Sequence, residues 1–402
     1  MKKVAIIGTV GLPANYGGFE TLVNHIVKNL GKKYDFTVYC TTKKYKREER
    51  KRSFLNAKLK YIPLEANGVQ SILYDALSIL HALFYADVLI ILGVAGAWIL
   101  PFVYLFSNKK IIVSIDGIEW KRQKWNGIAK LYLWIAEKIA VKFSHRDISD
   151  NEAIQDYTAI RYGTLSRIIE YGGDHIIKVE STDADHDHYT FLKYLYAVKV
   201  CRIEPENNVH EVLEAFSEVN KMYLVIIGNW NNSQYGRTLK QQYSSYNNIF
   251  LLDPIYDQRT LDLIRGNAIL YIHGHSAGGT NPSLVEAMYL GLPVIAYDVS
   301  YNKQTTENKA LYFKHAADLK NTINITSLEN LKKNAEIMHK IATRRYTWKL
   351  IAEKYDALII ECLQEKIKNS LSPRIVKYNY EILKKHHAAH LKNSYAFYEK
   401  RN

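Results

Sequence analysis

The stretch that decides the fold of this 402-residue chain spans residues 268–288 and reads AILYIHGHSAGGTNPSLVEAM. Its first six residues form a short apolar and aromatic run that is typical of a buried strand. A glycine-rich turn follows, and apolar residues then recur at helical spacing. Asn281 is a favourable N-cap and Pro282 a favourable first helical residue, so we predict a helix that begins there. Strand, loop and helix in this order are the repeating unit of a parallel α/β sheet.

The same stretch predicts a phosphate site. Gly278, Gly279 and Thr280 precede the helix, where exposed amides and the helix dipole favour an anion, so a diphosphate docks there without a metal. Glu286 lies one turn inside the helix among apolar neighbours. Its carboxylate therefore needs hydrogen-bond donors, and two ribose hydroxyls of a nucleotide are suitable. The alternative is a surface glutamate on an amphipathic helix, with the glycines as a flexible loop.

Short strand-like runs alternate with helical stretches along most of the chain. In the first half the predicted strands are 4–8, 36–40, 88–92 and 111–115, and in the second half they are 195–200, 223–228, 249–252, 268–273, 293–297 and 310–313. We therefore predict an α/β protein with two doubly wound, Rossmann-like domains that face each other across a cleft. The predicted limits are an N-terminal domain over 1–175, a C-terminal nucleotide-binding domain over 176–366 and a basic tail over 367–402.

A basic side chain follows the predicted strand 195–200. Ligands of open α/β sheets bind beyond the carboxyl ends of the strands, so Arg202 is placed there to neutralise a leaving pyrophosphate. A structural salt bridge with Glu204 or Glu206 is the alternative.

A second glycine-rich loop lies between the first strand and a helix predicted to begin near Gly18. Such a loop presents free backbone N–H groups to an anion. The spacing of Gly8, Gly11 and Gly17 is too long for the dinucleotide fingerprint, and no acidic residue ends the second strand. A dinucleotide-dependent dehydrogenase is therefore disfavoured.

The charge is unevenly distributed. Lys and Arg number 54 against 40 Asp and Glu, and residues 1–180 carry 26 basic against 17 acidic side chains, residues 181–367 carry 20 against 21, and residues 368–402 carry 8 against 2. A basic surface attracts polyanions, among which we favour a membrane surface or a lipid pyrophosphate. The cluster of Lys and Arg in residues 43–52 either leans on anionic lipid or is a solvated loop. The sequence pI of about 9.3 also suggests a nucleic-acid-binding protein, but the neutral second half and the lack of a recognition motif disfavour it.

Residues 88–106 are almost wholly apolar and long enough to be a transmembrane candidate. Gly93, Gly96 and Pro101 divide them into a strand, a turn and a short helix, so we expect an interfacial helix or buried core. The three cysteines have no paired spacing, which predicts neither a disulfide nor a zinc site and fits a reducing cytosol. The acidic and His residues of 183–188 are adjacent on a linker and cannot all converge on one ion, so no metal site is predicted.

Four segments in order along the chain carry a family resemblance: PANYGGFET at 13–21, DGIEWKR at 116–122, YGGD at 171–174 and GHSAGGTNPS at 274–283. Together they resemble the retaining GT-B glycosyltransferases of the family 4 type, and more narrowly their rhamnosyltransferase-like branch in bacterial polysaccharide biosynthesis. The resemblance covers residues 1–366. It implies front-face attack without a protein nucleophile, with the leaving phosphate helping to deprotonate the acceptor.

The resemblance also implies roles for individual residues. Glu286 matches the second glutamate of the Glu-x7-Glu motif, which holds the ribose, and Arg202 matches the phosphate-contacting arginine. Asp116 lies where the acceptor-side polar residue of the family is found, and would position the incoming hydroxyl.

Two positions depart from the family pattern. Gly278 stands where the first glutamate of the motif is expected, and Asn207 or Asn208 replaces a lysine. Loss of that glutamate suits a donor with fewer hydroxyls, such as a deoxysugar, and His275 or Asn281 would take over the contact with the sugar. The predicted donor-binding residues are Gly17, Gly18, Asn207, His275, Gly278, Gly279, Thr280, Asn281 and Glu286, and the predicted catalytic residues are Asp116 and Arg202.

We therefore expect a glycosyltransferase that moves a sugar, with rhamnose favoured, from dTDP-rhamnose or a UDP-sugar to a saccharide acceptor. The acceptor is expected to be linked to a lipid pyrophosphate and received by the first domain, and no cofactor or metal is expected. The expected location is cytoplasmic and peripheral at the inner membrane face. A sugar-nucleotide epimerase of the same fold is the rival enzyme, and it would isomerise its donor without an acceptor.

Overall fold

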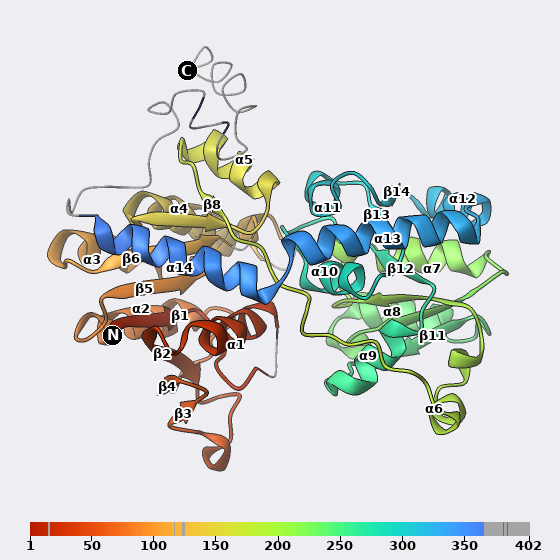
Figure 1. Cartoon of the computed structure of the whole chain (residues 1–402), viewed down its shortest axis with the longest axis horizontal. Coiled ribbons are helices and arrows are strands. Elements are labelled where there is room, and N and C mark those ends of the chain that lie inside the picture. Colours follow the sequence, from red (N-terminus) through yellow and green to blue (C-terminus); the bar gives the residue numbers. More distant parts are fainter. Residues whose placement is uncertain (15–16, 116, 123–124, 366–380, 382–383, 385–402) are drawn as a thin grey trace. The chain divides into compact units, whose positions relative to one another are not determined.

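The computed structural model describes residues 1–14, 17–115, 117–122 and 125–365, with Glu381 and Lys384 beyond them. The chain forms two compact units. The first joins Met1–Glu170 to the chain from Lys349 onward, and the second is Tyr171–Trp348. In each unit helices cover both faces of a mainly parallel sheet (Figure 1). The predicted pair of doubly wound α/β domains is therefore confirmed.

Within the described residues the first unit holds an eight-stranded sheet in the order β3-β4-β2-β1-β5-β6-β7-β8. Its strands are β1 (Lys2–Ile7), β2 (Tyr34–Thr41), β3 (Ser53–Phe54), β4 (Ala57–Ile62), β5 (Val88–Leu92), β6 (Lys110–Ile115), β7 (Arg146–Ser149) and β8 (Arg167–Ile168). β3 pairs antiparallel with β4, and the other pairs are parallel. The chain reverses its direction across the sheet between β1 and β5, so their carboxyl ends mark its switch point.

The helices of this unit cover both faces of its sheet. They are α1 (Gly18–Leu30), α2 (Ser71–Leu83), α3 (Leu100–Phe106), α4 (Gly127–Phe143), α5 (Glu152–Tyr162) and α14 (Trp348–Gln364). α1 and α14 lie on the face turned toward the viewer in Figure 1, and α2, α3 and α4 share an apolar core on the other face. Every residue of β5 is buried, as expected of a parallel strand covered on both sides.

Helix α14 packs with the first unit. Glu361 on this helix pairs with Arg146 at 2.9 Å and with Arg167 at 2.8 Å, both from the last strands of the first sheet. The structure thus places α14 in the first unit, whereas the sequence assigned all of 176–366 to the second domain. The sequence missed this return because ion pairs between such distant residues leave no local pattern. Apart from Glu381 and Lys384, the predicted basic tail lies outside the described residues.

In its described residues the second unit holds a six-stranded parallel sheet in the order β11-β10-β9-β12-β13-β14. The strands are β9 (Tyr196–Val200), β10 (Tyr223–Ile227), β11 (Ile249–Leu252), β12 (Leu270–His273), β13 (Val294–Tyr297) and β14 (Leu311–Phe313). The helices are α6 (Asp183–His188), α7 (Val209–Ser217), α8 (Gln234–Tyr243), α9 (Gln258–Gly266), α10 (Pro282–Tyr289), α11 (Ser300–Thr305), α12 (Ala316–Ile325) and α13 (Leu328–Arg345). Two apolar cores sandwich the sheet, one under α7, α8 and α12 and the other under α9, α10 and α13.

The central strands of the second sheet are β9 and β12, which are parallel neighbours. The chain moves outward from β9 through β10 to β11 and then returns to β12. Loops that follow two such strands diverge to opposite sides and leave a crevice at the carboxyl edge, where ligands of open α/β sheets bind. The loops after β9 and β12 are the segments that the sequence singled out.

Residues 88–106 form β5, a turn, the 3₁₀ turn η2 (Ala97–Ile99) and the short helix α3, which is the predicted division of this segment. In the described part of the chain, no helix has the length and apolarity needed to cross a bilayer.

Candidate functional site

The loops after β9 and β12 are fastened to each other. Asn208 Nδ2 donates to the carbonyl oxygen of Gly274 at 2.8 Å. The backbone amide and the hydroxyl of Ser276 both donate to the carbonyl oxygen of Glu206, at 2.8 and 2.9 Å. These bonds hold the segments that contain Arg202 and Gly278 together at the carboxyl edge of the sheet.

Helix α10 begins as the sequence predicts. Asn281 is its N-cap, and its Oδ1 accepts hydrogen bonds from the backbone amide of Ser283 at 3.1 Å and from the Ser283 hydroxyl at 2.8 Å. Pro282 is the first helical residue. Because the cap uses the Asn281 amide oxygen, this side chain orients the start of the helix.

The loop before α10 has a backbone that only glycine adopts readily. Gly278 has a φ of 135°, and apart from its chain neighbours no described residue has an atom within 4 Å of the position of a Cβ. An L side chain at this φ would strain the backbone although the space is open. The backbone conformation therefore favours a glycine at position 278. Gly279 and Thr280 complete the turn, and Thr280 is buried.

Glu286 has two charged or polar partners that the sequence did not predict. Arg265, at the end of α9, forms an ion pair with Glu286 Oε2 and also contacts Asp262 Oδ1 at 3.0 Å. His175 Nε2 lies 3.3 Å from Glu286 Oε1. Burial opposes ionisation of Glu286, but Arg265 and His175 outweigh it and lower the pKa of its carboxyl to about 2. Glu286 is therefore an anion near neutral pH, and each of its oxygens keeps a lone pair for a ligand donor.

The proton on His175 is held in place by a tryptophan. Trp348 Nε1 donates to His175 Nδ1 at 3.0 Å, and since an indole nitrogen only donates, Nδ1 is the acceptor. The ring proton is then on Nε2, which faces Glu286. A chain of hydrogen bonds therefore runs from Trp348 through His175 to Glu286.

The YGGD segment, which carried part of the family resemblance, packs beside the hydrogen bonds that join Trp348, His175 and Glu286. Asp174 Oδ1 accepts the backbone amide of Trp348 at 2.6 Å. A Cβ on Gly172 would lie 2.5 Å from the Trp348 ring, and one on Gly173 would lie 2.9 Å from the carbonyl oxygen of Val285 in α10. The two glycines are therefore needed for close packing beside Glu286.

Arg202 follows β9, as predicted, and its side chain is 56% exposed. Its nearest acidic partner is Glu204, at 3.8 Å, a long contact for an ion pair. The predicted alternative of a salt bridge with Glu204 is therefore present only in a weak form. The guanidinium remains accessible to an anion.

Two other predicted donor-binding residues contact the protein itself. Asn207 is buried, and its Nδ2 donates to the carbonyl oxygen of Arg202 at 2.6 Å, so its side chain closes the turn after β9. The ring of His275 stacks on that of His273 with a centroid distance of 4.5 Å. The His275 carbonyl oxygen accepts from Asn302 Nδ2 at 2.9 Å.

Lys199 and His273 are buried polar residues that sequence reasoning missed. No described residue forms a hydrogen bond with Lys199 Nζ or with either ring nitrogen of His273. Burial lowers the pKa of both side chains. A Cβ on Gly274 would lie 2.6 Å from Lys199 Nζ, so this amine lies directly beneath the loop that follows β12. A lysine within an otherwise apolar strand was the available sequence signal.

Replacement of Lys199 by methionine should stabilise the protein. A buried polar group without a hydrogen-bond partner costs about 1–3 kcal/mol, and methionine has a similar shape without that cost. We expect a higher midpoint in thermal unfolding for Lys199→Met and no change for Lys332→Met, an exposed lysine of α13. A lower midpoint for Lys199→Met would show that the amine contributes to folding.

The glycine-rich loop after β1 is fastened by Glu20, another residue that the sequence did not single out. Glu20 Oε1 accepts from the Thr9 hydroxyl and from the Val10 amide, each at 2.7 Å. The Val10 amide is therefore not one of the free N–H groups that were predicted for this loop. Gly17 has a φ of 88° and precedes α1, and Gly18 is the first residue of that helix, as predicted.

Asp116, the predicted acceptor-side residue, lies outside the described residues. The strand that leads to it, β6, ends at Ile115. Among the residues that the structure describes, no group of three or more His, Cys, Asp or Glu side chains is arranged to hold a metal ion.

Two family models match the chain. Residues 1–174 match a domain of unknown function, DUF1972, and residues 181–345 match the family described as glycosyl transferases group 1. The second match includes Arg202, Arg265 and Glu286. No curated protein sequence matches the chain.

Solved structures resemble the chain over nearly its whole length. Sucrose-phosphate synthase from Thermosynechococcus elongatus has a TM-score of 0.76 at 15% identity, covering 90% of this chain and 99% of the other. HepE from Anabaena, solved with UDP-glucose, has a TM-score of 0.70 at 14% identity, covering 90% and 100%. The catalytic domain of starch synthase IV from Arabidopsis thaliana, solved with ADP and acarbose, has a TM-score of 0.68 at 14% identity, covering 90% and 99%. At these identities the similarity establishes a shared fold.

Proposed function

We propose that this chain, a GT-B glycosyltransferase with a group 1 domain in its second unit, transfers a sugar from a nucleoside diphosphate donor to a saccharide acceptor. The observation that supports this most strongly is the state of Glu286. Arg265 and His175 keep its carboxylate ionised at the switch point of the second sheet, beside a helix N-terminus preceded by a glycine turn. Such a site suits a ligand with hydroxyl donors next to an anionic group.

The donor would bind in two parts. Its ribose hydroxyls would donate to the remaining lone pairs of Glu286, and its diphosphate would lie against the amides that precede α10. The exposed guanidinium of Arg202 would neutralise the charge that develops on the diphosphate when the sugar leaves. We favour dTDP-rhamnose or a UDP-sugar as the donor. The complexes of HepE with UDP-glucose and of starch synthase IV with ADP, which share the fold, support a nucleoside diphosphate.

Gly278 supports a deoxysugar. A carboxylate at this position would accept hydrogen bonds from sugar hydroxyls, but glycine offers no side chain and its backbone disfavours one. A sugar that lacks a hydroxyl, such as rhamnose, leaves fewer donors unpaired in such a site. His275 and the half-buried part of the loop would supply the remaining contacts.

We further propose transfer with retention of the anomeric configuration. The bond between the anomeric carbon and the leaving phosphate oxygen breaks, the acceptor oxygen bonds to that carbon from the same face, and the acceptor proton passes to the leaving phosphate. The protein then needs to position and neutralise rather than attack, and Arg202 and the amides before α10 fit that task. No cofactor or metal is required in this scheme.

The acceptor is proposed to be a saccharide linked to a lipid pyrophosphate and received by the first unit, with Asp116 orienting its hydroxyl. The excess of basic residues in 1–180 supports an anionic acceptor. The protein would then act at the cytoplasmic face of the inner membrane, as a peripheral protein.

Thermal shift of the purified protein against nucleoside diphosphates and nucleotide sugars tests the donor site, because a ligand that binds the native state raises its stability. We expect dTDP-rhamnose or a UDP-sugar to raise the unfolding midpoint, and Arg202→Ala to weaken binding about 10-fold or more. Arg259→Ala is the matched control, since Arg259 is 60% exposed and lies 3.9 Å from Asp185, much as Arg202 lies near Glu204. Equal effects of the two variants, or a shift only with single-stranded nucleic acid, would contradict the proposal.

A further inference from the structure

Helix α2 of the first unit is apolar on both its inner and its outer side. Its inner side packs on the sheet. Its outer side presents Leu73, Leu77 and Leu80, one turn apart, and Phe84 follows at the carboxyl end with 89% of its surface exposed. A helix that is apolar all round is normally buried, so the outer side of α2 is an apolar surface that the described residues leave exposed.

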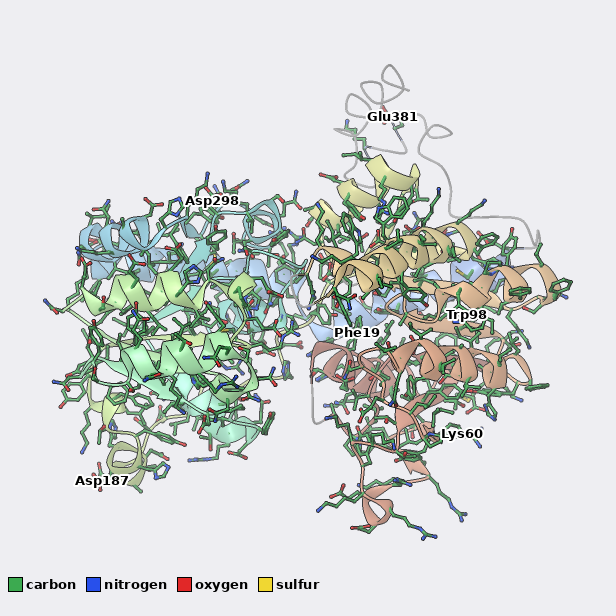
Figure 2. The ribbon with its side chains drawn as sticks, turned by 180° about the vertical axis from the view of Figure 1, so that it is seen from behind. Phe19, Lys60, Trp98, Asp187, Asp298 and Glu381 are labelled. Carbon is green, nitrogen blue, oxygen red and sulfur yellow. The ribbon has the colours of Figure 1, made fainter. Side chains whose placement is uncertain are left out.

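The next helical segment repeats this feature. Trp98 in η2 and Phe102, Leu105 and Phe106 in α3 are all exposed, and Phe106 has 81% of its surface exposed. Figure 2 labels Trp98 on the side of the first unit that is hidden from the viewer in Figure 1. Residues 88–107 contain no charged side chain.

Helix α4 continues the surface. Ile128, Leu131, Trp134 and Ile135 recur at helical spacing on its outer side, and Ile128 is 84% exposed. We call the surface formed by these exposed side chains of α2, η2, α3 and α4 the apolar face. Contiguous exposed apolar patches of this kind mark a site of interaction.

The helices that form the apolar face are joined beneath it. The backbone amide of Gly96, just before η2, hydrogen bonds to Asp75 of α2. Tyr132 of α4 donates to the carbonyl oxygen of Ala95. α4 also packs directly against η2 and α3. The elements that carry the apolar face are therefore fixed to one another.

The exposed ionised side chains on the helices that form the apolar face have one sign. Among the described residues of α2, η2, α3 and α4, the acidic side chains are Asp75 and Glu137, and both are buried. Glu137 is paired with Arg161 at 2.9 Å. The ionised side chains that α4 exposes are Lys138 and Lys142. A partner for this surface should therefore have an apolar interior that is covered by a layer of negative charge.

We propose that the apolar face docks the first unit on an anionic lipid bilayer. Large aliphatic and aromatic side chains would enter the boundary between headgroups and acyl chains, Trp98 and Trp134 would lie at the headgroup level, and the lysines of α4 would contact anionic headgroups. α3 has 7 residues, about 10 Å of helix, so it lies in the interface and does not cross it.

A second copy of the chain fits this surface less well. A two-fold dimer would bring the same patch from both copies together, so the lysines of α4 would face each other with no exposed carboxylate of these helices to pair with. A lipid surface supplies the missing negative charge. This docking surface rests on the proposed function, in which the acceptor is attached to a lipid, and it adds where the protein contacts the membrane.

Vesicle binding tests this proposal. The purified full chain should co-sediment with vesicles of phosphatidylglycerol and phosphatidylcholine, and less with vesicles of phosphatidylcholine alone or at high salt. Phe84→Ser with Phe106→Ser should weaken partitioning at least 10-fold, because both side chains are exposed in solution and would be buried in lipid. The matched control is Ile325→Ser with Leu328→Ser, two exposed apolar residues of the second unit, which should bind like the wild type.

Three outcomes would overturn the proposal. The first is that the wild type fails to bind anionic vesicles, and the second is that the Phe84→Ser with Phe106→Ser variant binds them like the wild type. The third is that the wild type is a dimer in solution and the double variant is a monomer. The last would identify a second copy as the occupant. The thermal shift with nucleotide sugars needs no vesicles. If nucleotide sugars raise the unfolding midpoint of the wild type but the wild type does not bind vesicles, the docking face alone is rejected. The reverse result would reject the donor assignment alone.

Discussion

Glu286→Ala should lower both the stability of the protein and its affinity for the donor. The substitution leaves the guanidinium of Arg265 buried with one remaining acidic partner, Asp262 at 3.0 Å. Breaking a buried ion pair from one side costs about 3–5 kcal/mol, and we expect the lower end because Asp262 remains. Loss of two hydrogen bonds from ribose to a carboxylate should weaken donor binding about 100-fold or more. Thermal unfolding with and without donor measures both effects.

A double variant separates the two roles of Glu286. Glu286→Leu combined with Arg265→Met removes both charges, and a buried ion pair replaced by apolar side chains of similar size is often neutral in stability. We expect the double variant to regain most of the unfolding midpoint that Glu286→Ala loses, and to remain unable to bind the donor. If it regains donor binding as well, Glu286 has only a structural role and the ribose contact is wrong.

The second large effect is a dependence of stability on pH that comes from Asp75. This side chain of α2 is buried, and its Oδ1 has no hydrogen-bond partner among the described residues. Burial raises the pKa of Asp75 to about 8, against the partial opposition of a hydrogen bond from the Gly96 amide. In the unfolded chain an Asp has a pKa of about 3.9. At a pH between these two pKa values, Asp75 is therefore protonated in the folded protein and ionised in the unfolded chain.

The stability from protonated Asp75 is fully present below about pH 4 and is lost as the pH rises toward 8. Each pH unit in this window removes up to about 1.4 kcal/mol. Asp75→Asn cannot ionise, so its unfolding midpoint should vary less between pH 5 and pH 9 and should exceed that of the wild type at pH 9. Asp253→Asn, an exposed control in the second unit, should follow the wild type. If the unfolding midpoint of Asp75→Asn depends on pH in the same way as that of the wild type, Asp75 is not the source of the pH dependence.

The parts of the fold that the sequence predicted depend on nearby residues. All six strands of the second sheet were predicted from short apolar runs, whereas β3, β4, β7 and β8 of the first sheet were not among the predicted strands. In β4, AKLKYI, lysines alternate with apolar residues and are exposed, so the run does not read as a buried strand. β7, RDIS, is buried throughout although it contains Arg146, which pairs with Glu361 of α14, and Asp147, which accepts a hydrogen bond from Thr164.

Sequence alone determined the start of α10 at Asn281 and Pro282, the start of α1 at Gly18 and the division of residues 88–106, because caps, turns and glycine conformations depend on a few adjacent residues. Tertiary structure decided which charges meet. It paired Glu286 with Arg265 and His175, and it placed the side-chain amide of Asn207 in a hydrogen bond with the carbonyl oxygen of Arg202. Within the part of the chain that the structure describes, it also left the outer side of α2 exposed, since an apolar pattern shows which side chains avoid water but not which neighbour covers them.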